Sequence, residues 1–226
     1  MLCMKGGAMR YILLILIINL SFAIERGGFG GFMFVLDLPD VEGLNQDFSQ
    51  YKIPEVSGRL IGIGGSGFAV LKRILIGGGG YSGREVAESE SIRVELTISG
   101  GEFKLGYNLI STRYLNGAIS TGFGGSTYRL SLCPRLEQVS FNEILADPKR
   151  YVELEGSHFL IHPEAILIFS IPYQPISFLH IGISGGVNLN IFPEEWSYKG
   201  IKVLQGPKLG VANPNLSLKI LLGGGV

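Results

Sequence analysis

The sequence has no excess of charge of either sign, little cysteine and no hydrophobic run long enough for a membrane helix. Its 19 Lys and Arg balance 19 Asp and Glu, so the formal net charge is zero. Nucleic-acid binders need clustered Lys and Arg, so nucleic acid is excluded as a partner. Of the two cysteines, Cys3 lies in a segment that we expect to be removed, which leaves Cys133 without an internal disulfide partner. Because a membrane helix needs about twenty apolar residues, a membrane-inserted form must be a closed barrel.

The first residues have the three-part form of a secretory signal peptide. Lys5 and Arg10 precede an apolar run over 11–20, and Ser21-Phe22-Ala23 supplies small residues at the cut. The run is too short to cross a bilayer as a helix. We expect the mature chain to start near Ile24. The chain then divides into a signal peptide that is removed, 1–23, and one β-barrel domain, 24–226.

Glycine is abundant, and it stands among Ile, Leu, Phe and Tyr. The 34 glycines are about twice the ordinary share. They show no Gly-x-y period, which excludes collagen, and their apolar neighbours exclude a flexible linker. Glycine inside strand-like text marks bulges, bends or close backbone approach.

Strand-like segments with alternating polarity fill the mature chain. In the seventh, Leu179, Ile181 and Ile183 oppose His180 and Ser184, which is typical of a strand with two unlike faces. Several segments exceed the nine to eleven residues, approximately, that a tilted strand needs to cross the hydrocarbon. The segments are 29–39, 57–70, 73–87, 91–111, 116–133, 153–173, 177–191 and 214–224.

The connections between these segments nearly alternate in length. Short links lie around 71–72, 112–115 and 173–176, whereas the first, fifth and seventh connections are long; only the link around 87–90 breaks the contrast. This alternation is typical of outer-membrane barrels with short inner turns and long outer loops. The sequence therefore predicts an all-β fold, a single up-and-down antiparallel β-barrel of about eight strands.

Two long loops are expected to contain short helical turns. Ser140-Phe141-Asn142-Glu143 has the form of a capping box, and Pro148 would end the helix soon after it. Leu44 to Phe48 gives a weaker signal of the same kind.

In three segments the apolar parity changes at a glycine pair. The pairs are Gly64-Gly65, Gly100-Gly101 and Gly124-Gly125. One extra residue in a strand swaps its two faces, so we expect a β-bulge at each pair.

With these bulges, a set of charged side chains is expected to face the barrel interior. Both signs occur in near balance, which suits an interior filled by ion pairs, and a barrel of this size is too narrow for an aqueous pore. We predict in particular an ion pair between Glu102 and Arg129. The expected lumen charges are Arg93, Glu95, Glu102, Lys104, Arg129, Glu164 and Lys219.

Candidate chemistry is sparse. His162 and Glu164 share one face of a strand and are the candidates for a Ser–His–carboxylate hydrolase, although spacing identifies no serine. The expected register places Ser170 opposite His180. His180 is then too far from His158 and His162 for a three-His metal site. The text 62–67 fits the pattern G-x-G-x-x-G, but no helix follows it, so no nucleotide site is expected. No cofactor and no metal are expected.

The signal peptide, the segment pattern and the alternating loops together resemble small eight-stranded outer-membrane β-barrel proteins. The texts 61–68, 76–81 and 146–150 (IGIGGSGF, IGGGGY and ADPKR) are similar to a Gly-rich family of uncharacterised bacterial proteins. This resemblance implies a barrel and an outer-membrane location, and no activity. Such barrels usually end in an aromatic residue, whereas this chain ends Leu221-Leu-Gly-Gly-Gly-Val226.

Three functions are compatible with these observations. The favoured one is a non-enzymatic, monomeric outer-membrane barrel that acts as an anchor, structural element or surface-display scaffold, with membrane lipid as its partner. The alternatives are a lipid-modifying outer-membrane hydrolase and an exported soluble barrel, periplasmic or secreted, that binds a small apolar ligand. The orientation of Ile181 and Ile183 distinguishes a membrane barrel from a soluble ligand-binding barrel. In a membrane barrel these side chains point outward, and in a ligand-binding barrel they point into the cavity.

Overall fold

The structure, a computed structural model, describes residues 26–135, 152–171, 178–191, 196–204, 206–207 and 209–225. The expected signal peptide, the capping box at Ser140 and the expected turn around Gln174 lie outside the described residues.

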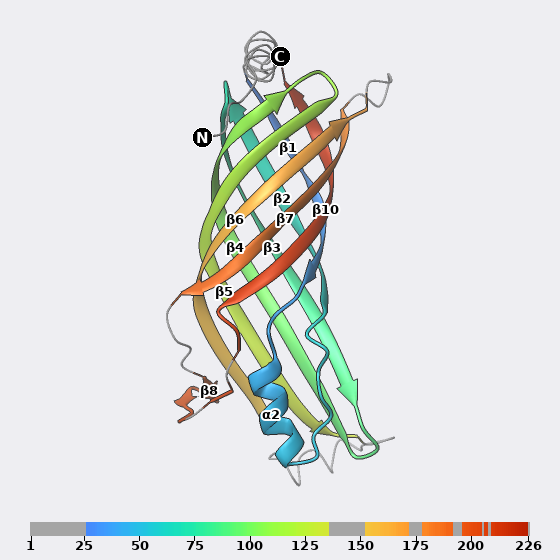
Figure 1. Cartoon of the computed structure of the whole chain (residues 1–226), viewed down its shortest axis with the longest axis vertical. Coiled ribbons are helices and arrows are strands. Elements are labelled where there is room, and N and C mark those ends of the chain that lie inside the picture. The colour runs from blue at the N-terminus through green and yellow to red at the C-terminus, as the bar shows by residue number, and fades with distance from the viewer. Residues whose placement is uncertain are drawn as a thin grey trace, which may run out of the picture.

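Eight long strands form one closed antiparallel barrel (Figure 1). Each strand pairs with the next along the chain, and the last pairs with the first. The predicted all-β, up-and-down barrel is therefore confirmed. The strands are β1 (Arg26–Asp37), β2 (Leu60–Leu71), β3 (Ile74–Glu88), β4 (Ile92–Ser111), β5 (Leu115–Pro134), β6 (Val152–Ser170), β7 (Leu179–Ile191) and β10 (Ala212–Gly225).

The pairing register fixes the width of the barrel. Gly27 pairs with Gly225, but following paired residues once around the barrel from Gly27 leads back to Asn215, ten residues earlier on β10. Strand number and this shear together set the tilt and diameter, and eight strands leave an interior that side chains can fill.

The two ends of the barrel differ. One end has the turns at 72–73 and 112–114, and β1 begins and β10 ends there; we call it the short-turn end. The opposite end has the helix α2 (Glu42–Gln50) and the short strands β8 (Ser197–Tyr198) and β9 (Ile201–Lys202), and we call it the α2 end (Figure 1). The helix lies where Leu44 to Phe48 predicted a helical turn.

Apolar side chains fill the barrel at both ends. The short-turn cluster consists of Phe29, Phe68, Val70, Leu75, Ala118, Ile166, Ile168 and Leu221. The α2 cluster joins Leu44 and Phe48 of the helix to Trp196 and to the inner faces of β4 and β5, including Val94, Leu96, Ile98, Tyr128 and Leu130. Polar side chains occupy the interior between the two clusters.

The bulges expected at the glycine pairs are absent from the described strands. The pairing runs without a shift through Gly100-Gly101 and Gly124-Gly125, and the register of β4 and β5 shifts only between Asn108 and Ile110. Along β4, Leu96 and Lys104 are both buried inside the barrel, so the inner face continues unchanged. The expectation of swapped faces was wrong.

At these glycine pairs, the inner and outer faces of the strands pass into different surroundings. Towards the α2 end, the inner faces of β4 and β5 pack against the helix and are apolar, while their outer faces are charged. Between the two apolar clusters the outer faces are apolar and the interior is polar. A strand that passes from one environment to the other reverses its polarity pattern with no extra residue.

The glycines allow close strand approach instead. A Cβ on Gly64 would overlap the carbonyl oxygen of Gly80, and one on Gly124 would overlap that of Gly101. Both positions face the interior, so the missing side chains let neighbouring strands curve tightly around a narrow barrel.

Candidate functional site

The outer surface of the barrel carries an apolar belt that includes every long strand. Its side chains are between 40% and 74% exposed, which is a far larger apolar surface than a water-soluble monomer presents. Ile181 and Ile183 belong to it and point outward, as a membrane barrel requires. The belt includes Phe32, Phe34, Ile61, Ile63, Ile74, Phe103, Leu105, Ile119, Phe123, Leu167, Phe169, Ile181, Ile183, Leu218 and Ile220.

Beyond the belt, towards the α2 end, the outer faces of β3 to β6 form a charged face of ion pairs. Arg84 lies 2.8 Å from Glu95, and Arg129 lies 3.1 Å from Glu153. Arg93 lies 3.4 Å from Glu88. These side chains are partly exposed, and such pairs stabilise a fold by about 0–1 kcal/mol each.

Three expected lumen charges, Arg93, Glu95 and Arg129, therefore lie outside the barrel. The pair between Glu102 and Arg129 was also wrong, because Glu102 pairs with Gly124 and Arg129 with Thr97. Arg129 was assigned to the interior because its apolar neighbours were taken to face lipid. Those neighbours are instead buried in the α2 cluster, which turns Arg129 to the outside.

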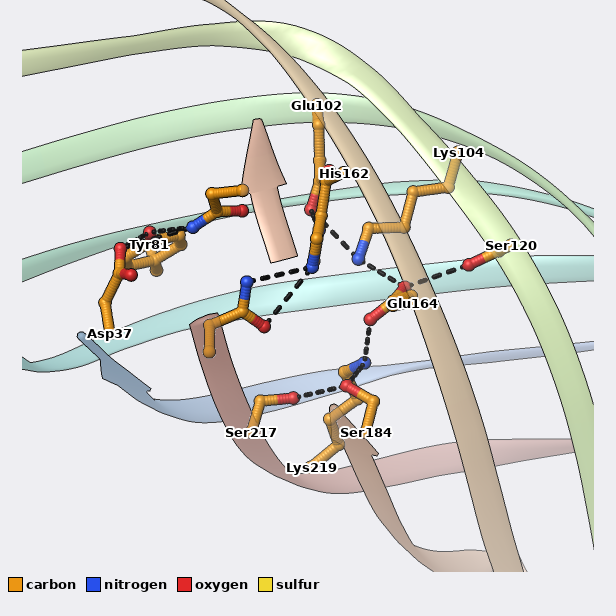
Figure 2. Close-up of polar contacts among 12 residues, drawn as sticks. Asp37, Tyr81, Glu102, Lys104, Ser120, His162, Glu164, Ser184, Ser217 and Lys219 are labelled. Atoms are coloured by element: carbon orange, nitrogen blue, oxygen red, sulfur yellow. Dashed lines mark hydrogen bonds and ion pairs between the residues drawn. The ribbon is translucent and has the colours of Figure 1, made fainter. Parts of the chain in front are cut away.

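The other expected lumen charges, Glu102, Lys104, Glu164 and Lys219, meet inside the barrel together with His162 (Figure 2). We call these five residues the lumen charge network. Lys104 contacts both carboxylates, with its Nζ 2.9 Å from Glu102 Oε1 and bonded to Glu164 Oε1. Lys219 Nζ lies 3.3 Å from Glu164 Oε2, and His162 Nδ1 lies 3.0 Å from Glu102.

Neutral side chains complete the contacts of the network. Ser120 donates a hydrogen bond of 3.0 Å to Glu164, and Lys219 donates one of 2.7 Å to Ser184. Asn215 Nδ2 lies 3.0 Å from His162 Nε2. Lys104 and Lys219 are only 1% and 0% exposed. Buried charges are tolerated only when they are paired and hydrogen-bonded, and here each ammonium group has a carboxylate partner.

A second polar group, which sequence reasoning missed, lies towards the α2 end. Tyr81 donates a hydrogen bond to Asp37, and Asn188 Nδ2 lies 3.1 Å from the Tyr81 hydroxyl oxygen (Figure 2). Asn190 and Asn213 both donate to the Tyr128 hydroxyl, at 3.0 and 2.8 Å. Asp37 gave no signal, because both faces of the first segment are apolar in sequence.

The described residues form no Ser–His–carboxylate arrangement around His162. Its contacts are Glu102 and Asn215, while Ser120 bonds to Glu164. Ser170 does pair with His180, as the register predicted, with Oγ 2.9 Å from Nδ1. The other nitrogen of His180 faces the backbone carbonyl of Gly223.

Within the described residues, no group of three or more His, Cys, Asp or Glu side chains is arranged to hold a metal ion. No helix in this part of the chain has the length and hydropathy needed to span a membrane.

A closed eight-stranded barrel with an apolar outer belt and a polar, filled interior defines the class of small outer-membrane β-barrels. Among solved structures, the chain is similar to Ail, the attachment invasion locus protein of Yersinia pestis. The TM-score is 0.52 at 9% identity, over 88% of this chain and 99% of that chain. The structure of Ail with the heparin analogue sucrose octasulfate matches equally well, at a TM-score of 0.52 and 8% identity. No protein-family model and no curated protein matches the sequence. The likeness is one of fold.

Proposed function

We propose that this chain is a non-enzymatic outer-membrane protein whose barrel is a closed anchor and whose α2 end is displayed at the cell surface. The observation that supports this most directly is the filling of the lumen. The lumen charge network lies between two apolar clusters, and its lysines are fully shielded from solvent. An interior filled in this way by the described side chains favours a closed anchor over a water-filled pore.

The α2 end is built as a pre-formed surface. The segment that follows α2 is held by Glu85, whose carboxylate accepts hydrogen bonds from the backbone amides of Ser57, Gly58 and Arg59. Asn45 bonds to both the amide and the carbonyl of Val56. Ordered loops of this kind suit a structural or display role at the membrane surface.

The orientation follows from the connections. Outer-membrane barrels place their short turns in the periplasm and their longer loops outside. The α2 end, with its long connections, is accordingly the outer one.

Site-directed labelling tests the orientation. In a Cys133→Ser background, Tyr51→Cys places a thiol beside α2, where the native side chain is 74% exposed. Arg113→Cys places one at the short-turn end. A membrane-impermeant maleimide should label the first variant in intact cells and the second only after permeabilisation. The reverse pattern would contradict the proposed orientation.

Conductance tests the closed lumen. The purified protein should leave a planar lipid bilayer without steady channels. The comparison is the double variant Lys104→Ala with Lys219→Ala. It lacks the two largest side chains of the network and is therefore the variant most prone to conduct ions. Regular channel openings by the unmodified protein would contradict the anchor function.

A further inference from the structure

A shallow groove of about 700 Å³ lies on the outer surface of the barrel, across β4, β5, β6 and β7. Ala165 and Gly185, which pair directly on β6 and β7, are the smallest residues of this surface. Larger side chains border them, and Tyr107 and Ile119 among these are 45% and 51% exposed. We call this feature the β4–β7 groove. The other outward side chains that line it are Leu105, Thr121, Pro163 and Val187.

The β4–β7 groove presents no charge to a ligand. Among the described residues that line it, none of the outward side chains is charged. Ser120 and Glu164 also line it, but their side chains are bonded to each other inside the barrel. An ionic headgroup would therefore find no counter-charge in the groove, whereas a hydrocarbon chain would find a matching apolar surface.

The groove lies within the apolar belt, away from both of its edges. Along β6, the exposed Phe159 and Phe169 are ten residues apart, which is about the length of strand that crosses the hydrocarbon. Ala165 lies between them on the same outer face. The groove is thus continuous with the lipid-facing surface on both sides, and lipid chains are the molecules that reach this depth.

The fold itself does not require the hollow at Gly185. A Cβ at this position would meet only ordinary contacts, 3.8 Å from the side chain of Leu216 and 3.9 Å from the carbonyl oxygen of Asn215. Gly124 differs, because a Cβ there would overlap the neighbouring strand. The missing side chain of Gly185 therefore leaves room outside the barrel and not between its strands.

We propose that the β4–β7 groove holds one hydrocarbon chain of a membrane lipid. The inference rests on the membrane anchor of the proposed function, because only an inserted barrel exposes this groove to lipid. Lipid tails are as apolar as the groove, so close packing, and not removal from water, holds the chain. A second copy of the barrel fits less well, since two cylinders touch along a narrow line whereas a flexible chain can follow a groove.

Native mass spectrometry of the full mature chain tests this site. The barrel is released from detergent after addition of dimyristoyl phosphatidylethanolamine or dimyristoyl phosphatidylglycerol. The wild type should retain one lipid per barrel and bind the two lipids alike, because the groove recognises the chain. Ala165→Leu combined with Gly185→Leu fills the groove. This variant should bind the lipid about tenfold more weakly or worse, since the chain loses roughly ten close atom contacts.

The matched control makes the same two kinds of change elsewhere in the belt. Ala69→Leu combined with Gly30→Leu adds leucine at outward positions of β2 and β1, where a Cβ on Gly30 meets nothing closer than 3.8 Å. This control should retain the lipid.

Four results would overturn the proposal: an equal loss of lipid in the control, no bound lipid on the folded wild type, binding that depends on the headgroup, or a dimer that the groove-filling changes abolish. The last result would make a second copy the occupant. Heat-dependent gel migration verifies that each variant is folded. A wild type that fails to fold into vesicles would contradict the membrane anchor as well as the groove, so the two failures are distinguishable.

Discussion

The carboxylate of Glu164 on β6 reaches across β7 to the ammonium group of Lys219 on β10, with Oε2 and Nζ 3.3 Å apart. The same carboxylate bonds on its other side to Lys104, from β4 beyond β5. One side chain thus joins three strands that share no backbone pairing. The charges of the lumen network therefore join β4, β6 and β10, a link that the backbone hydrogen bonds between neighbouring strands do not provide.

We predict that Glu164→Gln destabilises the barrel by about 3–5 kcal/mol, because two buried ammonium groups lose a shared counter-charge. Urea unfolding in lipid vesicles measures the loss. Arg129→Gln is the control, since its partners are at the surface and its removal should cost about 0–1 kcal/mol. The double variant Glu164→Gln with Lys219→Met should cost less than the two single changes added together. Additive costs would show that the pair is not coupled.

We predict that Ile181→Arg impairs folding into vesicles by at most about 2–4 kcal/mol, which is the cost of Arg at the bilayer midplane. Val86→Arg is the matched control. Val86 also faces outward, but it lies on the charged face opposite Glu95, where Arg gains a partner. Ser184→Arg is unsuitable as a control, because Ser184 already bonds to Lys219 inside the barrel. If Ile181→Arg and Val86→Arg lowered the free energy of folding equally, the assignment of Ile181 to a lipid-facing belt would be contradicted.

We predict that Leu44→Ala loosens α2 without unfolding the barrel. Leu44 is 1% exposed in the α2 cluster, and such a truncation costs about 2–5 kcal/mol of local packing. Limited proteolysis should then cleave within 38–59 faster, while heat-dependent gel migration stays normal. Gln46→Ala, an exposed change on the same helix, should leave the cleavage rate unchanged. Loss of the folded gel band in Leu44→Ala would show that the helix is part of the barrel's own cooperative unit.

We predict that Gly124→Ala blocks assembly of the barrel, whereas Gly101→Ala does not. A methyl group on Gly124 would overlap the carbonyl of Gly101, but one on Gly101 meets only an ordinary contact of 3.8 Å. The two glycines lie on neighbouring strands at nearly the same height. The yield of folded protein after dilution from urea into vesicles compares them. Normal yield of Gly124→Ala would mean that the strands can separate at little cost.

The sequence by itself determined the barrel and the order of its strands. Period-two polarity and strand length are local properties, and the lengths of the connections determine which strands are neighbours. Glu102, Lys104, Glu164 and Lys219 also followed from local parity, since their strand segments lie within the apolar belt.

Only the tertiary structure decided which face each residue of the long strands presents beyond the belt. Local parity describes a contrast between two faces and does not say which face meets water, lipid or another element. The inner face of β5 near Tyr128 is apolar because α2, more than seventy residues earlier in the chain, packs against it. Because of that contact, Arg129 points outward. The pairing register places Glu102 beside Lys104 and His162 instead. Both depend on contacts between residues distant in sequence, which a local pattern does not contain.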